Sequence, residues 1–306
     1  MAARRSGRPV HGWLVVDKPA GLSSAAVVGR VRRALDAAKA GHGGTLDPLA
    51  TGVLPVALGE ATKTVAYVMD GAKAYRFRVI WGEARAGDDA EGDVIAVSAV
   101  RPDAAAILGA LPRFLGEIEQ TPPAYSAIKV GGRRAYALAR AGETPALASR
   151  RVRIESLELC GHGADWADFE MRCGKGTYVR ALARDLALAL GTVGHVGSLR
   201  RTRCGPYCEK DAISLAMIEQ FGHSAAAANL ILPIATALDD IPALAVTEEE
   251  ARRLRCGQSV LLPADRRPLP PISAGKTVRA MAEGRLVALA RIDDDGSVRA
   301  VRVINL

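Results

Sequence analysis

The sequence predicts an α+β protein with two parts: a mixed, largely antiparallel central sheet with flanking helices, and a small, mostly β domain at the C-terminus. Strand-like and helical segments follow one another up to Pro242 without the strict βαβ order of a parallel sheet. Beyond Pro242, short strand-like runs are separated by Gly, Pro and Asp turns. The length of 306 residues suits one large and one small domain. We therefore expect domains over 1–242 and 243–306.

Turn residues and apolar spacing predict the first elements. Residues 12–16 are typical of a short buried strand, which Pro19 ends because proline cannot continue a strand ladder. A helix follows, with Ser23 or Ser24 as its N-cap. Its apolar face is predicted by a four-residue spacing, and the opposite face is basic. The apolar positions are Val27, Val31 and Leu35.

The next segments contain a loop, a short helix and a strand. Residues 40–55 form a glycine-punctuated loop that leads into the apolar run 53–58, and residues 60–69 are compatible with a second helix. A strand of period-two alternation follows, with a glutamate- and aspartate-rich loop over 88–93 that we expect to be solvated. The alternating apolar residues are Tyr75, Phe77, Val79 and Trp81.

The second half of the large domain contains two helices, two strands and an irregular excursion. Residues 103–111 are alanine-rich and predict a helix that ends at Pro112. The stretch 120–150 is irregular and indicates an excursion from the core. Strands are predicted over 152–159 and 169–173, and a strongly amphipathic helix over 177–190.

The C-terminal domain is predicted from one helix signal and several strand-like runs. Thr247 and Glu250 form a capping box for a short helix. The strand-like runs are 259–262, 277–282, 285–292 and 297–304.

Charge indicates an anionic partner. The net charge is +8, and three blocks of +6 each, residues 1–42, 129–153 and 172–203, account for more than all of it. Residues 204–306 are close to neutral. The blocks either converge into one phosphate-binding surface or are solvated helix faces on different sides of the protein, and charge alone leaves both readings open.

Several classes of protein are excluded by composition. The longest uncharged stretch, 220–238, is too polar to cross a bilayer, and the N-terminal apolar run 13–16 is too short for a signal peptide. We therefore expect a cytoplasmic protein without membrane contact. The five cysteines are an odd set and predict free thiols, and no ligand spacing indicates a metal site. No P-loop or other nucleotide motif occurs, and we expect no cofactor.

The densest signal is the segment 41–52, GHGGTLDPLATG. Its glycines allow the main chain to approach a ligand closely, and Pro48 fixes the chain directly after Asp47. This pattern can hold one carboxylate rigidly at the mouth of a cleft. From the residues alone, an aspartate in a loop is more often a turn or cap residue than a catalyst.

Four motifs resemble the TruB family of tRNA pseudouridine synthases. They are GHGGTLDPLATGVLP at 41–55, DKPAGLSS at 17–24, QTPPAYSAIK at 120–129 and KGTYVR at 175–180. They occur in the family's order, and the resemblance covers most of residues 11–205. The family usually has a Thr-Asp-Thr-like turn where this chain has residues 83–87, and we expect this departure to leave the site residues untouched.

The resemblance implies the roles of the site residues. It implies that Asp47 is the catalytic aspartate, that Tyr75 stacks on the target base and that Arg180 pairs with Asp47. It further implies that His42 enters the T loop beside the displaced base and that Tyr178 and Leu199 line the uridine pocket. Lys18 and Lys129 match positions that lie near RNA in the family. No metal is implied.

The resemblance also implies the fold, reaction and partner. It implies a pseudouridine synthase catalytic domain with an RNA-binding excursion at 120–150, a PUA-like C-terminal domain, and cofactor-free isomerisation of uridine 55 in the T loop by base flipping. The implied partner is the T-arm stem-loop of tRNA. The resemblance implies that a monomer binds it without an obligatory protein partner. Two alternatives stay open: an RNA-binding or RNA-folding factor with a vestigial pocket, and a synthase acting on ribosomal RNA guided by partner proteins.

Overall fold

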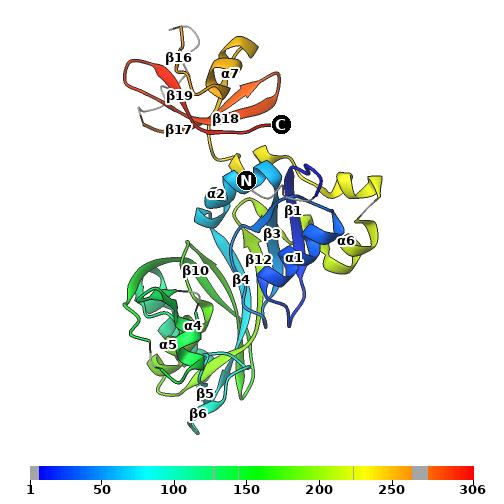
Figure 1. Cartoon of the computed structure of the whole chain (residues 1–306). Helices are drawn as coiled ribbons and strands as arrows, with labels where there is room; N and C mark the ends of the chain where they lie inside the picture. Colours follow the sequence, from blue (N-terminus) through cyan, green and yellow to red (C-terminus); the bar gives the residue numbers. More distant parts are fainter. Residues whose placement is uncertain (1–6, 127, 144, 223, 264–274) are drawn as a thin grey trace.

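The computed structural model describes residues 7–126, 128–143, 145–222, 224–263 and 275–306. Its main feature is one large sheet that runs through the lower and middle parts of the molecule (Figure 1). In spatial order the strands are β14 (Ile213–Ser214), β1 (Gly12–Lys18), β3 (Thr51–Leu58), β12 (Gly194–Cys204), β4 (Lys73–Trp81), β11 (Trp166–Cys173), β10 (Arg150–His162) and β7 (Gly116–Gln120). Two further strands pair at the side, β2 (Ala40–His42) with β3 and β13 (Tyr207–Cys208) with β12.

The sheet is mixed and largely antiparallel, as predicted. Among the described residues, β1 with β14 and β3 with β12 are its parallel pairs, and its other pairs are antiparallel. The β3–β12 junction joins two halves of the sheet: β3 begins just after Asp47, and the last part of β12 pairs with the start of β3. The functional residues predicted from distant parts of the sequence therefore come together at this junction.

Helices cover each half of the sheet. On one half α1 (Ser24–Ala34) packs against α6 (Leu215–Phe221), and on the other α5 (Val179–Ala189) packs against β12 and β4 (Figure 1). Shorter helices lie at the edges: α2 (Val65–Asp70), α3 (Ala104–Ala110) and α4 (Ala135–Arg140). Two small hairpins complete this part, β5 (Glu83–Arg85) with β6 (Val94–Val97), and β8 (Lys129–Val130) with β9 (Arg133–Arg134).

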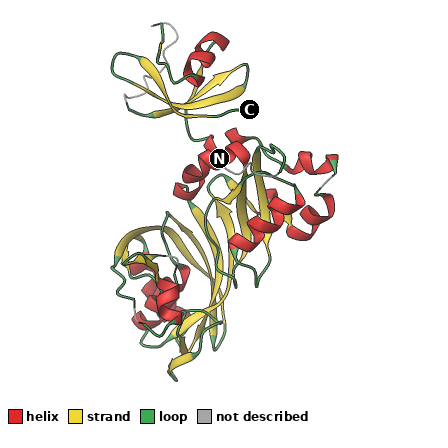
Figure 2. Ribbon diagram, viewed as in Figure 1, coloured by secondary structure: helices red, strands yellow, loops and turns green. Residues whose placement is uncertain are grey.

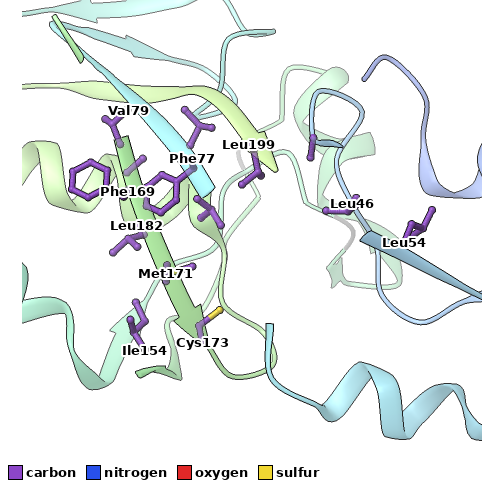
Figure 3. Packing of buried hydrophobic residues seen from close by; sticks show 14 of the residues in the cluster. Leu46, Leu54, Phe77, Val79, Ile154, Phe169, Met171, Cys173, Leu182 and Leu199 are labelled. Atoms are coloured by element: carbon purple, nitrogen blue, oxygen red, sulfur yellow. The ribbon is translucent and has the colours of Figure 1, made fainter. Parts of the chain in front are cut away.

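Apolar packing between α5 and the sheet forms the larger core. Phe77 of β4 and Phe169 of β11 stack with their ring centroids 5.3 Å apart, and Leu182 of α5 is fully buried in the same cluster (Figure 3). Leu199 of β12 closes the cluster toward the segment that holds Leu46. Rings stacked across neighbouring strands keep β4 and β11 in register, which fixes where the ends of these strands project.

Most predicted elements are confirmed, and the differences include one helix and the strands β7 and β12, which were not predicted. Ser23 caps α1, since its Oγ accepts a hydrogen bond from the Ala26 amide at 3.1 Å. The helix predicted over 60–69 is instead a 3₁₀ turn (Gly59–Thr64) followed by α2, because the Thr62 and Thr64 hydroxyls bond back to carbonyls three residues earlier. The central strand β12 is missing from the sequence prediction because arginines interrupt its apolar alternation.

The C-terminal residues form a second sheet with its own core. Its strands are, in spatial order, β15 (Ala243–Ala245), β17 (Thr277–Ala282), β18 (Arg285–Ile292), β19 (Ser297–Val303) and β16 (Val260–Leu261). Helix α7 (Glu248–Arg255) covers this sheet and begins with the predicted capping box of Thr247 and Glu250 (Figure 2). The α+β class with a C-terminal sheet domain is thus confirmed. The part of the chain that the structure describes holds no helix long and apolar enough to span a membrane.

Candidate active site

Asp47 lies in the loop between β2 and β3, and buried side chains hold this loop from inside. The Ser24 hydroxyl donates to the Leu46 carbonyl at 2.9 Å and accepts from the Leu46 amide at 2.8 Å. Gly44 has φ of +140°, a conformation that L side chains rarely adopt. The backbone on the N-terminal side of Asp47 is therefore fixed by one serine and by a glycine turn.

Lys18 holds the other side of the loop and does not face solvent. Its side chain is fully buried, and its Nζ donates to the carbonyls of Pro19, Pro48 and Ala50 at 2.6 to 3.0 Å. Burial lowers the pKa of Lys18 to about 8, although Asp47 acts in the opposite direction. The ammonium group of Lys18 therefore shapes the loop through these three hydrogen bonds, and a position of Lys18 near RNA stays a prediction.

Arg201 of β12 is a third buried support that the sequence analysis missed. It is 1% exposed and donates to the carbonyls of Val53, Thr45 and Gly44 at 2.8, 3.2 and 3.0 Å. A charged arginine inside a protein must find acceptors, and here the acceptors belong to the loop of Asp47. The two adjacent arginines of β12 have different partners, since Arg200 pairs with Asp17 and Glu209. No local pattern separates these roles.

Arg180, at the start of α5, pairs with Asp47 as the resemblance implied. Its Nε lies 2.9 Å from Asp47 Oδ2, and the arginine side chain is 4% exposed. The same guanidinium pairs with Asp89, Nη1 to Oδ2 at 3.0 Å, and donates to the carbonyls of Gly87 and Tyr125 at 2.9 Å. One cation is thus shared by two carboxylates and two main-chain segments.

Two interpretations of the acidic loop are corrected by these contacts. Asp89 is 6% exposed, and Asp88 pairs with Arg184 one helical turn beyond Arg180, at 2.8 Å. The loop is therefore an internal ion-pair partner of α5 and is not merely solvated. The departure from the family pattern at 83–87 also adjoins the site, because the Gly87 carbonyl accepts directly from Arg180.

The pKa of Asp47 is raised above its usual range. Burial is the largest cause and outweighs the attraction of Arg180, and the neighbouring charge of Asp89 raises the pKa further. Arg180 therefore offsets the effect of burial on the Asp47 pKa only in part. An aspartate that must be ionised to react consequently needs a higher pH than an exposed one.

We expect the acidic limb of the rate profile to lie above the ordinary aspartate pKa of about 3.9. Because the ionised form is active and its pKa is raised, activity falls as the pH drops through that raised value. The variant Asp89→Asn removes a neighbouring negative charge, so its acidic limb should move to lower pH. Single-turnover rates between pH 5 and 8 give the acidic limb of the native enzyme and that of the variant. An upward shift in the variant would contradict the assigned coupling.

A cavity of about 290 Å³ opens beside Asp47 and Arg180. Tyr75, Tyr178 and Leu199 line it, so the three residues predicted to surround the uridine do share one cavity. Burial raises the pKa of Tyr75, which keeps its hydroxyl protonated and uncharged. Tyr178 is fixed through its main chain, which exchanges two hydrogen bonds with the Gln120 side chain at 2.7 and 3.0 Å.

A second cavity of about 650 Å³ is also lined by Asp47 and Arg180. His42 lines it, and the Nδ1 of His42 is buried without a hydrogen-bond partner among the described residues. Burial lowers the pKa of His42, so the ring is neutral at physiological pH. Lys129 lies in the β8–β9 hairpin, within the predicted excursion, and its position near RNA stays a prediction.

The three basic blocks contribute residues to the site but few free charges. Residues of the blocks 129–153 and 172–203 line both cavities and residues of the block 1–42 line the second, but several cations of the blocks 1–42 and 172–203 are bonded inside the protein. These internally bonded cations are Lys18, Arg180, Arg184 and Arg201. The net charge therefore overstates the number of cations that are free to meet a phosphate.

Comparison with known proteins agrees with this geometry. Residues 32–179 match the family model for the TruB family pseudouridylate synthase N-terminal domain, and residues 180–239 match the tRNA pseudouridylate synthase B C-terminal domain. The chain is 57% identical to tRNA pseudouridine synthase B of Rhodospirillum rubrum, covering 100% of both chains. It is 54% identical to the protein of that name in Bradyrhizobium diazoefficiens, covering 99% of this chain and 88% of that one.

Solved structures show the same fold. The chain aligns with a structure of a Cbf5-Nop10-Gar1 complex at a TM-score of 0.72 and 26% identity, over 96% of this chain and 85% of that one. A structure of an H/ACA RNP bound to a substrate RNA aligns at a TM-score of 0.73 and 23% identity, over 100% and 92% of the two chains.

Together, the fold and the aspartate-centred cavity define an RNA-modifying isomerase of the pseudouridine synthase class. The chain belongs to the TruB family of pseudouridylate synthases. The predicted enzyme class is confirmed. A vestigial RNA-binding factor is disfavoured because Asp47 and Arg180 pair on the wall of a cavity that Tyr75 also lines.

Proposed function

We propose that the protein isomerises uridine 55 in the T loop of tRNA to pseudouridine, with Asp47 as the catalytic carboxylate. The observation that carries this proposal is the pairing of Asp47 with Arg180 at 2.9 Å on the wall of a cavity that Tyr75 also lines. The reaction breaks the N1–C1′ bond and forms a C5–C1′ bond. The proton on C5 leaves to solvent, and N1, which carries no proton in uridine, takes one up, so that substrate and product are isomers.

The charge state of Asp47 decides what it can do. An ionised carboxylate can attack the sugar or the base as a nucleophile, or take a proton from the sugar. Arg180 favours the ionised form inside a cavity that otherwise disfavours charge. About a third of the Asp47 side chain, 31%, remains exposed toward the cavity, so the carboxylate is accessible to a base placed there.

The target uridine must leave the RNA stack to reach Asp47. Extrusion of a base costs about a few kcal/mol, and stacking on an aromatic side chain returns about 1–3 kcal/mol. Tyr75 supplies the ring, and Leu199 and Tyr178 provide the remaining apolar wall. We assign His42, in the second cavity, to the nucleotides that flank the displaced base.

Replacing Tyr75 by leucine tests the stacking role. We expect kcat/KM for a tRNA transcript to fall about 10- to 100-fold, because the stacking free energy is lost while Asp47 stays in place. The conservative variant Tyr75→Phe keeps the ring and should retain most of the binding. Equal losses in the two variants would show that the hydroxyl, rather than the stacked ring, is what the reaction needs.

We further propose that a single chain acts on the T-arm stem-loop in the cytoplasm without a partner protein, with residues 1–242 as the catalytic domain and 243–306 as a PUA-like domain. The excursion 120–150 contacts RNA in this proposal, and its Tyr125 carbonyl is already bonded to Arg180. The structural neighbours named above include complexes with other proteins. Guidance by partner proteins is therefore the alternative to test.

The decisive experiment uses the purified chain and a bare T-arm stem-loop. Release of tritium from 5-tritiated uridine measures turnover, and mass spectrometry maps the modified position. We expect stoichiometric conversion at position 55 alone. Conversion only after addition of a guide RNA or a partner protein would overturn the proposal.

A further inference from the structure

We propose that Arg150 binds a phosphate of the everted nucleotide at the rim of the Asp47 cavity. This inference rests on the proposed function, and it assigns a substrate contact to a residue outside the motifs of the sequence analysis. Arg150 begins β10, and it lines the same cavity as Asp47 and Tyr75. The observations that support the assignment are its unused donors, its fixed orientation and its position.

The guanidinium of Arg150 is only partly used by the protein. One amino group, Nη2, donates to the Gly176 carbonyl. The Nε is buried and has no hydrogen-bond partner, and Arg150 has no acidic partner among the residues that the structure describes. A donor that is left without a partner destabilises the free protein, so a ligand that accepts a hydrogen bond from it binds more tightly. A phosphate can accept from two guanidinium nitrogens at once.

Other side chains hold this guanidinium in one orientation. Its central carbon lies 4.7 Å from the ring centroid of Tyr178, in a cation–π contact. On another side it lies against Gly176, whose φ of +84° brings the turn 174–177 close to the arginine. The guanidinium is therefore oriented before substrate arrives, which reduces the entropy lost on binding.

The other cations of this cavity are not available for the same role. Lys73 donates its Nζ to the carbonyls of Met69 and Gly71, at the C-terminal end of α2. Arg180 is shared by two carboxylates, and Arg201 is bonded to three carbonyls. Arg150 is left as the lining cation with free donors in the described part of the chain.

The position of Arg150 favours contact with a phosphate of the nucleotide rather than with its base. The interior of the cavity is formed by residues that are less than 10% exposed, among them Lys73, Val179, Leu199 and Arg201. Arg150 is half-buried and lies next to the exposed Gly176, at the edge of the cavity. If the base enters toward Leu199, its sugar and phosphates remain at this edge.

The test combines a variant with a chemically altered RNA. Arg150→Gln should raise the KM for a T-arm stem-loop about tenfold and lower the salt dependence of binding by about one phosphate contact. Stem-loops with a single neutral methylphosphonate, either 5′ or 3′ of uridine 55, remove one phosphate charge at a time. With one of these altered stem-loops, the native enzyme should lose about as much affinity as Arg150→Gln loses with the unmodified stem-loop. With the same altered stem-loop, Arg150→Gln should lose no further affinity.

The control is Arg151→Gln, which removes the same charge from the next, exposed position of β10. It should remain fully sensitive to the same methylphosphonate. Additive losses for Arg150→Gln with both altered RNAs would overturn the proposal and leave Arg150 as a support for Tyr178. That outcome is separable from failure of the proposed function, because the native enzyme would still convert unmodified stem-loop at uridine 55.

Discussion

The variant Asp47→Asn should bind tRNA with a Kd within about threefold of the native value and form no measurable pseudouridine. Asparagine keeps the size of the side chain but cannot act as a nucleophile or take up a proton at neutral pH. Loss of such a group lowers rates by about 10²–10⁴-fold or more. Arg180 keeps Asp89 as a charged partner in the variant, so we expect the site to stay folded. Tritium release and filter binding on the same preparation measure the two quantities.

The matched control for this prediction is Asp168→Asn. Asp168 forms an ion pair with Arg78 on the same sheet, 2.6 Å long, and it does not line the Asp47 cavity. The control removes an equal charge and should leave turnover within about twofold, since exposed ion pairs contribute little to stability. Native product yield from Asp47→Asn would contradict the assignment of the catalytic carboxylate.

Local signals in the sequence were sufficient for the elements that depend on neighbouring residues. Ser23 caps α1 through a hydrogen bond that spans three residues, and the alternation around Phe77 gives β4 its buried face. The glycine and proline pattern around Asp47 also predicts a rigid turn from neighbouring residues. Each of these signals operates within one turn or one strand, where spacing and side-chain type determine the conformation.

The contacts of the buried charged residues that hold the site could not be predicted from local patterns, because their partners are distant in sequence. Arg201 bonds the Val53 carbonyl across 148 residues, and Arg180 meets Asp89 across 91. Composition suggests solvent or RNA for such charged residues. Burial changes that role, since a charge inside the protein is stable only with acceptors around it. The residues assigned wrongly or missed are therefore the buried charges.

The variant Arg180→Met should lose most activity at neutral pH and also lose stability. It leaves Asp47 and Asp89 facing each other without the cation they share, and removal of one partner from a buried ion pair costs about 3–5 kcal/mol. The attraction that opposes burial disappears, so the pKa of Asp47 rises further. A larger fraction of Asp47 is then protonated at pH 7. We expect the rate to fall more than about 100-fold, with the acidic limb displaced to higher pH.

The double variant Arg180→Met, Asp89→Asn separates the charge effect from the loss of packing. It removes the like charge that raises the pKa of Asp47, so part of the rate at pH 7 should return relative to Arg180→Met, and the acidic limb should move back toward lower pH. Arg184→Met, one turn further along α5, removes the partner of Asp88 and should leave the limb in place. If the double variant is no more active than Arg180→Met at any pH, then Arg180 acts by holding the Gly87 and Tyr125 segments rather than by setting the charge of Asp47.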